Sequence, residues 1–188
     1  MENKIIAVTN RHLSIRPFLE QIERVCQMHP EAIILREKDL TEEEYFTLSV
    51  DVLDICKKYD VACIFHSFPE VAVRLSVPRI HLPLWKLRET KRELLKEFEI
   101  VGSSVHSIEE AQEAERLGAT YITAGHVYAT DCKKGLPPRG TEFLSTVCQS
   151  VDIPVYGIGG IGLDEIQIRE VKACGAEGVC IMSEMMRI

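Results

Sequence analysis

The sequence predicts one α/β domain folded as a (β/α)8 TIM barrel over residues 1–188. Short apolar, β-branched runs alternate with longer amphipathic runs along the whole chain, which is the pattern of successive strands and helices. Eight of the short runs are apolar on both faces, as buried parallel strands are. Closing eight strands into a barrel leaves no open edge, whereas an open doubly wound sheet, the alternative, seldom needs eight strands in so few residues.

The short runs give the predicted strands in chain order. They are 4–8 (KIIAV), 32–35 (AIIL), 61–65 (VACIF), 79–82 (RIHL), 99–103 (EIVGS), 120–124 (TYITA), 153–158 (IPVYGI) and 178–182 (GVCIM). The amphipathic runs predict helices at 14–28, 41–59, 86–98, 107–118 and 163–175.

Residues with capping chemistry stand at the ends of three of these helices. Thr41 precedes three glutamates, and Ser107 is expected to form a capping box with Glu110. Gly118 and Gly175 follow their helices, where a glycine can take the left-handed conformation that ends a helix. The caps therefore agree with the periodicity.

The end of the chain departs from a complete barrel. After the eighth predicted strand only SEMMRI remains, so the last helix is expected to be truncated or missing. The flank between the last and first strands should then be thin. A partner subunit, which would make the protein a homodimer, the N-terminal segment, or a longer natural chain would cover it.

Composition and charge exclude several classes of protein. The 46% hydrophobic and 27% charged residues are ordinary for a globular domain, and the net charge of −7 argues against a general nucleic-acid or membrane-binding surface. Seven cysteines without a C-x-x-C pair suggest neither a zinc site nor a disulfide framework. The chain shows no signal peptide and no apolar run of about 20 residues, so we expect a cytoplasmic protein.

If the fold is a barrel, the functional residues lie in the loops after the strands. Polar residues are concentrated there, at 36, 38, 66, 67, 103, 104, 126–134, 159, 160 and 183. The run GIGGI at 157–161, followed by a helix start, offers backbone N–H groups to a phosphate together with the loop after the eighth strand. The alternative is a tight turn that simply requires glycine.

His126 stands where the sixth strand ends, and its alternative interpretation is a structural, hydrogen-bonded histidine. Arg36 and Lys38 alternate with Leu35 and Glu37, so they are expected to face the barrel interior and to meet an anion there, unless they pair with nearby acids. Cys132 is a weaker candidate nucleophile because no activating base is evident. His66 and His81 are expected to pack or to support other residues.

Four segments together resemble the thiamine phosphate synthase and TenI superfamily. They are LREKDLTEEE, VGSSVHSIEEAQEAERLGATYITAGHV, IPVYGIGGI and CGAEGVCIMS, and the resemblance covers nearly the whole chain. It implies a TIM barrel and one of two activities. Synthases join a pyrimidine pyrophosphate to a thiazole phosphate with magnesium, whereas TenI-type proteins include a thiazole tautomerase that aromatises a carboxythiazole phosphate by moving a proton.

The sequence resembles the tautomerase branch more closely. Synthases have aspartates for magnesium in an N-D-R turn and an H-L-G-Q-x-D stretch, where this chain has HSFPE, with Ser67, and HLPLWK, with Lys86. Ile34 replaces a glutamine that contacts the pyrimidine in synthases. The segment GHVYATDCKKG resembles the tautomerase loop, whose catalytic histidine matches His126.

The resemblance and the positions together imply a thiazole tautomerase of thiamine biosynthesis, an isomerase that needs no cofactor or metal and binds a small phosphorylated thiazole. Histidine suits acid/base catalysis because its unperturbed pKa is about 6.5. The alternatives are a non-catalytic TenI-like regulatory or binding protein and a thiamine phosphate synthase. The expected roles are acid/base catalysis for His126, carboxylate or charge binding for Arg36, Lys38 and Lys133, supporting contacts for Ser104 and Thr130, and phosphate binding for Gly159, Gly160 and Ser183.

Overall fold

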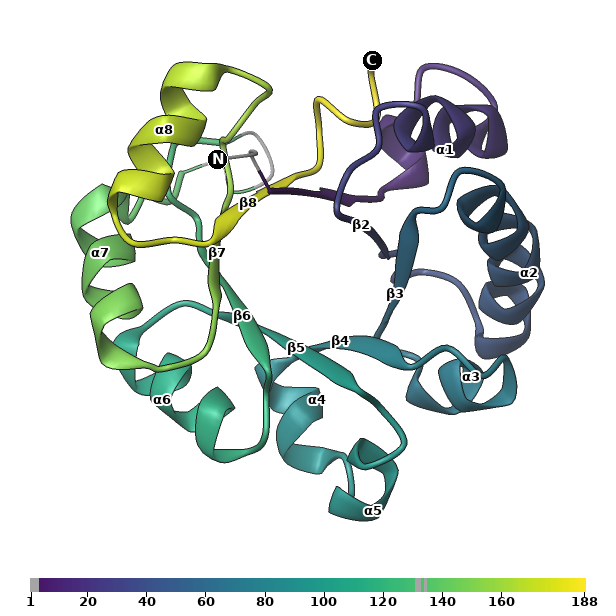
Figure 1. The fold of residues 1–188 in the computed structure, drawn as a ribbon, viewed down its shortest axis with the longest axis horizontal. Helices are drawn as coiled ribbons and strands as arrows, with labels where there is room; N and C mark the ends of the chain where they lie inside the picture. Colours follow the sequence, from purple (N-terminus) through teal and green to yellow (C-terminus); the bar gives the residue numbers. More distant parts are fainter. Residues whose placement is uncertain (1–3, 131–132, 134) are drawn as a thin grey trace.

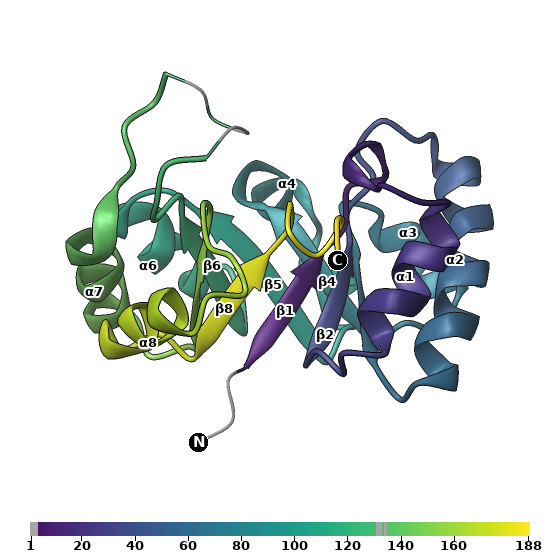
Figure 2. The ribbon, with the colours of Figure 1, turned by 90° about the horizontal axis from the view of Figure 1, so that it is seen from above.

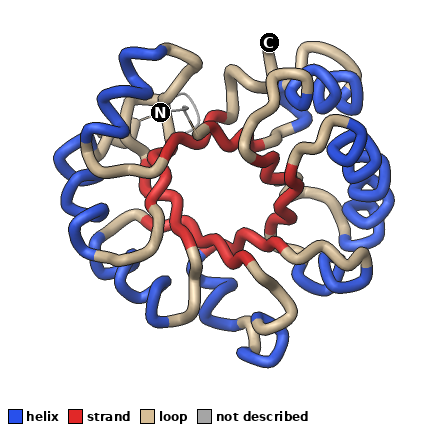
Figure 3. The backbone as a smooth tube through the Cα atoms, in the orientation of Figure 1, coloured by secondary structure: helices blue, strands red, loops and turns tan. Residues whose placement is uncertain are grey.

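The computed structural model describes residues 4–130, 133 and 135–188, and it confirms the predicted barrel. Eight parallel strands pair in chain order, and β8 pairs with β1, so the sheet closes into the ring seen in Figures 1 and 3. The strands are β1 (Ile5–Val8), β2 (Ala32–Leu35), β3 (Ala62–His66), β4 (Arg79–Pro83), β5 (Ile100–Val105), β6 (Tyr121–Gly125), β7 (Val155–Ile158) and β8 (Gly178–Ile181).

Helices surround this ring on the outside. The α-helices are α1 (Phe18–Cys26), α2 (Glu42–Lys58), α3 (Pro69–Arg74), α4 (Leu84–Glu89), α5 (Arg92–Leu95), α6 (Ile108–Arg116), α7 (Gly140–Ser150) and α8 (Glu165–Ala173), and Arg11–Leu13 form a 3-10 helix. No helix follows β8 in the described part of the chain, where residues 183–187 form turns, so the missing last helix is confirmed. Within the described residues, none of the helices is both long and apolar enough to span a membrane.

The short tail after β8 covers part of the thin flank itself. Met185 and Met186 are buried in the core, and Gln21 of α1 donates a side-chain hydrogen bond to the Met185 carbonyl (2.7 Å). The Ile15 backbone N–H bonds to the Met186 carbonyl (3.3 Å). The tail and α1 therefore close this side together, an arrangement that sequence reasoning did not foresee.

Four helical regions differ from the sequence prediction, and one of them is the predicted helix at 14–28, which begins only at Phe18, after Pro17. The predicted helix at 86–98 is two short helices, because Thr90 is extended and its hydroxyl bonds to the Lys86 carbonyl (2.8 Å), as a mid-helix Thr can do. Helices α3 and α7 were not predicted. α3 is short and begins with Pro69, which fits the first helical position, and α7 begins with Gly140, whose φ is +82°.

The predicted caps are present, with one correction. Ser107 accepts a bond from the Glu110 N–H (3.1 Å), but Glu110 accepts from the His106 N–H, so the predicted capping box is incomplete. Thr41 and Glu44 form the complete box. Gly118 and Gly175 have φ values of +99° and +96°, as helix-ending glycines do.

The barrel interior is filled with apolar side chains below the carboxyl ends of the strands. This inner cluster consists of Ile6, Val8, Ala32, Ile34, Ile64, Tyr121, Tyr156 and Cys180. Gly102 is needed beside it, because a Cβ at this position would overlap the Tyr121 ring. Above this cluster the interior becomes polar, and the candidate site begins there.

Candidate active site

A cavity of about 800 Å³ lies at the carboxyl ends of the strands. In Figure 2 this is the upper side, toward which the arrowheads of β1 and β8 point. Every residue to which the sequence analysis gave a role in the site lines this cavity, although the sequence places them in five separate loops or strand ends. They are Arg36, Lys38, Ser104, His126, Thr130, Lys133, Gly159, Gly160 and Ser183.

The alternation after β2 places the two cations as predicted. Arg36 and Lys38 face the cavity, whereas Leu35 and Glu37 are buried on the other side of the barrel wall. Burial, with the nearby charges of Arg36 and Lys133, lowers the pKa of the Lys38 ammonium. Three cations so close together favour a bound anion, which would offset their mutual repulsion.

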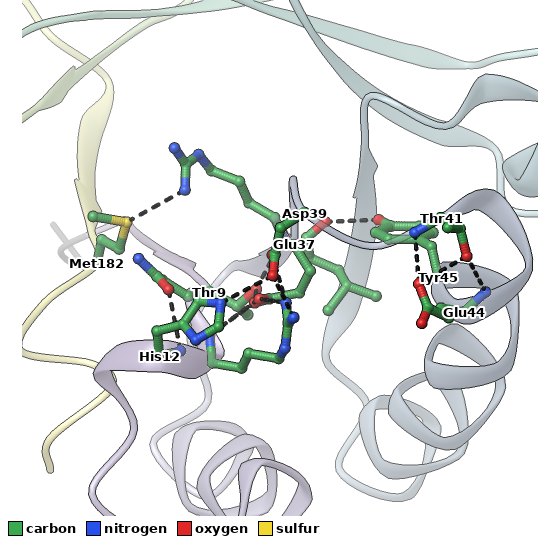
Figure 4. A network of polar contacts seen from close by, with 12 residues as sticks. Thr9, His12, Glu37, Asp39, Thr41, Glu44, Tyr45 and Met182 are labelled. Carbon is green, nitrogen blue, oxygen red and sulfur yellow. Dashed lines mark hydrogen bonds and ion pairs between the residues drawn. The ribbon is translucent and has the colours of Figure 1, made fainter.

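A buried carboxylate fixes the backbone that carries these cations (Figure 4). Glu37 has a side chain only 1% exposed, and it accepts bonds from the Thr9 hydroxyl (2.7 Å) and from the Arg11 N–H and guanidinium (both 3.1 Å). Thr9 in turn accepts the Arg36 N–H (2.9 Å). Arg11 also pairs with Asp39 (2.5 Å), so both nearby acids bind Arg11. The loops after β1 and β2 are thereby locked together.

His126 is buried beside the glycine turn after β7. Val127 and Tyr128 donate backbone bonds to the Ile158 and Gly159 carbonyls (3.0 and 2.9 Å), which extends the β6–β7 pairing past the strands. A Cβ at Gly159 would overlap the His126 Cβ and lie 2.7 Å from its Cα. Glycine is therefore required here for His126 to pack against the turn.

The His126 imidazole has few hydrogen-bond partners in the protein. Its Nε2 lies 3.4 Å from the Leu136 carbonyl oxygen, a long contact, and its buried Nδ1 has no partner among the described residues. A buried polar atom without a partner is costly, and in native proteins it is often a functional group. This favours the catalytic interpretation of His126 over the structural one.

A chain of polar groups forms the cavity floor. His81 Nδ1 lies 2.9 Å from the Tyr121 hydroxyl, and its Nε2 lies 2.8 Å from the Ser104 hydroxyl, which also accepts a bond from Thr123 (3.2 Å). His66 stacks on His81 with ring centroids 5.6 Å apart. Both histidines line the cavity, and their contacts with each other, Tyr121 and Ser104 agree with the expectation of packing or support.

Both floor histidines are held neutral. Burial, with the charge of Arg36, lowers the pKa of His81 to about 3, and burial with the charges of His81, Arg36 and Lys38 lowers the pKa of His66 well below its usual value. A neutral imidazole accepts at one nitrogen and donates at the other, and the two hydroxyl partners of His81 can match either tautomer.

We expect His81 to make the protein sensitive to acid. Because its pKa is lower in the folded than in the unfolded state, the unfolded state binds the extra proton between about pH 6.5 and pH 3, and stability falls as the pH is lowered through this window. The loss should be on the order of a few kcal/mol. The free energy of unfolding, measured by urea titration from pH 7 to pH 4, should fall less steeply in His81→Gln. Parallel curves for the two proteins would contradict this.

The glycine turn after β7 has the backbone conformation that a phosphate cradle would need. Gly159 and Gly160 have φ values of +96° and +72° and their N–H groups make no hydrogen bond within the described residues. The start of α8 contributes less than the sequence suggested, because the Leu163 N–H bonds to Glu184 (2.7 Å) and the Ile166 N–H to Asp164 (2.7 Å). A phosphate would therefore rest on the glycines and Ser183.

Other lining residues were not predicted. His106 and Glu110 follow β5, Thr123 lies in β6, and Trp85, which is 56% exposed, stands at the mouth. His106 could have been found, since it directly follows a strand, but its place before the helix cap led to a structural interpretation of this segment. Thr130 and Lys133 line the cavity as predicted, whereas Cys132 lies outside the described residues.

The described residues of the cavity do not offer the ligands that a magnesium ion requires. The carboxylates among them, Glu110 and Glu184, both accept backbone N–H bonds (2.5 and 2.7 Å). Within the described ranges no three His, Cys, Asp or Glu side chains are grouped to hold a metal. Magnesium prefers an octahedron of oxygen ligands, and a wall rich in Lys and Arg does not fit it.

Comparison with known proteins places the chain in a family. The TMP-TENI family model, described as thiamine monophosphate synthase, matches residues 5–185. The chain belongs to the TMP-TENI family. The family functions in thiamine biosynthesis, and the match does not distinguish its synthase branch from its TenI branch. The choice between these branches therefore depends on the cavity residues.

Several TMP-TENI proteins match over nearly their full length. The thiamine-phosphate synthase of Fusobacterium nucleatum is 30% identical over 185 residues, covering 97% of this chain and 89% of the relative. That of Clostridium acetobutylicum is 32% identical over 192 residues, covering 99% and 88%. The solved thiamine phosphate pyrophosphorylase from Pyrococcus furiosus superposes with a TM-score of 0.83 at 29% identity, covering 98% of this chain and 88% of that one.

Proposed function

We propose that this TMP-TENI protein is a thiazole tautomerase, which aromatises a carboxythiazole phosphate by moving a proton from the carboxylate-bearing ring carbon to the exocyclic carbon. The observation that carries the proposal is the composition of the cavity wall. It combines a buried imidazole, whose Nδ1 has no partner among the described residues, with a cluster of cations and a glycine turn, and its described residues include no group of carboxylates that could hold a metal.

Each part of the wall matches one requirement of this reaction. Arg36, Lys38 and Lys133 bind the carboxylate and stabilise the negative charge that develops after proton removal. Gly159, Gly160 and Ser183 hold the phosphate, and Ser104 and Thr130 make supporting contacts. His126 transfers protons as the acid/base residue.

Thiamine phosphate synthase is the second candidate, and the names of the relatives favour it. Against it stand Ser67 and Lys86 at the places where the synthase branch has its metal-binding aspartates. Without that metal, the charge of a leaving pyrophosphate would lose much of its stabilisation. A non-catalytic binding protein that retains the phosphate cradle is the third.

Incubation with two sets of substrates separates these three functions. We expect the protein to aromatise the carboxythiazole phosphate tautomer without added metal, which ultraviolet absorbance or NMR would follow. Coupling of the pyrimidine pyrophosphate to the thiazole phosphate in the presence of magnesium would instead identify a synthase. Binding of the thiazole phosphate without either reaction would identify a binding protein.

A further inference from the structure

We infer that His106 is a second proton-transfer residue of this cavity, which removes the proton from the ring carbon while His126 delivers one to the exocyclic carbon. The inference rests on the proposed tautomerase function. It concerns which of two imidazoles acts at which carbon, because the two carbons lie on opposite sides of the thiazole ring.

The hydrogen bonds of His106 define its tautomer. Its Nδ1 lies 2.8 Å from the carbonyl oxygen of Gly125. A carbonyl only accepts hydrogen bonds, so Nδ1 carries the proton and Nε2 of the neutral ring carries a lone pair. His106 lines the cavity, it is only partly buried, and Nε2 has no partner in the described part of the chain. The free nitrogen is therefore a base that is already oriented.

The position of His106 around the barrel agrees with this role. β5 and β6 are paired neighbours, with Ser104 opposite Thr123, so His106 and His126 follow adjacent strand ends. His126 packs against Gly159 of the phosphate cradle, whereas His106 lies one strand farther from it. In the substrate the exocyclic carbon belongs to the arm that bears the phosphate. That carbon would lie nearer His126, and the ring carbon nearer His106.

The backbone around His106 is also fixed. The Glu110 carboxylate accepts the His106 N–H (2.5 Å), and Ser107 caps α6 immediately after it. The acceptor of its ring N–H, the Gly125 carbonyl, belongs to the residue directly before His126. A hydrogen bond between the ends of the paired strands β5 and β6 thus links the positions of the two imidazoles.

The proposed step balances without a cofactor. His106 Nε2 takes the proton as the ring C–H bond breaks, and the electron pair moves through the conjugated ring to the exocyclic carbon. A C–H bond forms there as His126, which enters the cycle carrying a proton, releases it. His106 is left protonated and His126 neutral, and exchange with water restores both.

A purely structural role for His106 predicts a different result from a catalytic one. In His106→Asn, the side-chain amide N–H takes the place of Nδ1–H and can still bond to the Gly125 carbonyl, but no Nε2 remains. In His106→Ala both groups are lost. If His106 only holds the carbonyl, the Asn variant should recover most of the wild-type rate. If His106 transfers a proton, the Asn and Ala variants should both lose the aromatisation rate to the same extent.

Deuterium exchange assigns each imidazole to its carbon. The wild type, His106→Asn, His106→Ala and His126→Asn are incubated with the tautomer in D2O, and proton NMR follows loss of the ring-carbon proton and formation of product. In both His106 variants we expect exchange and product formation to fall together by about 10²–10⁴-fold. In His126→Asn, exchange at the ring carbon should continue at no less than about a tenth of the wild-type rate while product formation falls by about 10²-fold or more.

Two results would overturn the inference. One is a His106→Asn variant that retains more than half of the wild-type rate. The other is a His126→Asn variant that loses exchange and product formation in parallel, because a single histidine would then move both protons. A wild-type protein that aromatises nothing would refute the proposed function itself, which separates the two failures.

Discussion

Replacing His126 with Asn is expected to lower the rate of aromatisation by about 10²–10⁴-fold, the usual contribution of one positioned acid/base group. The fold should persist, because the buried Nδ1 has no partner to lose and Nε2 makes only a long contact of 3.4 Å with the Leu136 carbonyl. The measurement is kcat with the carboxythiazole tautomer, together with the unfolding temperature.

Binding of the product separates chemistry from affinity in this variant. In the proposed function the phosphate contacts, and the contacts of Arg36 and Lys38 with the carboxylate, come from other loops, so the Kd for the aromatic thiazole phosphate should change little. A near-normal rate in the Asn variant would exclude His126 as the acid/base residue. A variant that fails to fold would instead support the structural interpretation of this histidine.

Replacing Gly159 with Ala is expected to lower the rate by at least about 10²-fold, although residue 159 carries no acid/base group. The new Cβ would overlap the His126 Cβ and come within 2.7 Å of its Cα, so the loop after β6 must move. A displacement of about 1 Å at a reacting group is enough for such a loss. The φ of +96° adds strain, because an L side chain rarely adopts this conformation.

Gly118→Ala is the matched control for this substitution. Gly118 has a φ of +99°, but no atom lies within 4 Å of the Cβ that would be added. Both variants should therefore lose about 1–2 kcal/mol of stability from backbone strain, while only Gly159→Ala loses activity. Equal rates in the two variants would show that the packing of His126 against the turn is not needed for catalysis.

The barrel was predictable because each strand has a local signature. Buried parallel strands such as β2 (Ala32–Leu35) and β8 (Gly178–Ile181) are continuous apolar runs, and their length identifies them without knowledge of their neighbours. The break at Thr90 was not predictable in the same way. It depends on a hydroxyl that bonds to the Lys86 carbonyl instead of projecting into solvent, and the sequence of an amphipathic helix does not reveal that choice.

Which residues form the candidate site could be predicted from the sequence, but the contacts that they make could not. The rule that barrel sites form after the strands was enough to select Arg36, Lys38 and His126. It could not show that Glu37 binds Arg11 instead of the cations beside it, because that partner is 26 residues away. Nor could it show the free Nε2 of His106, since the tautomer depends on a carbonyl from another strand.

The network around Glu37 has a consequence for protein engineering. The groups that fix the backbone at positions 36 and 38 are Thr9, Arg11 and Glu37, and Glu37 is buried on the far side of the barrel wall from the cavity. Under the proposed function, scaffold and specificity are therefore encoded by different residues of two neighbouring loops. A library that varies Arg36 and Lys38 while keeping these three residues constant could retarget the cavity to substrates with another charge, with little loss of stability.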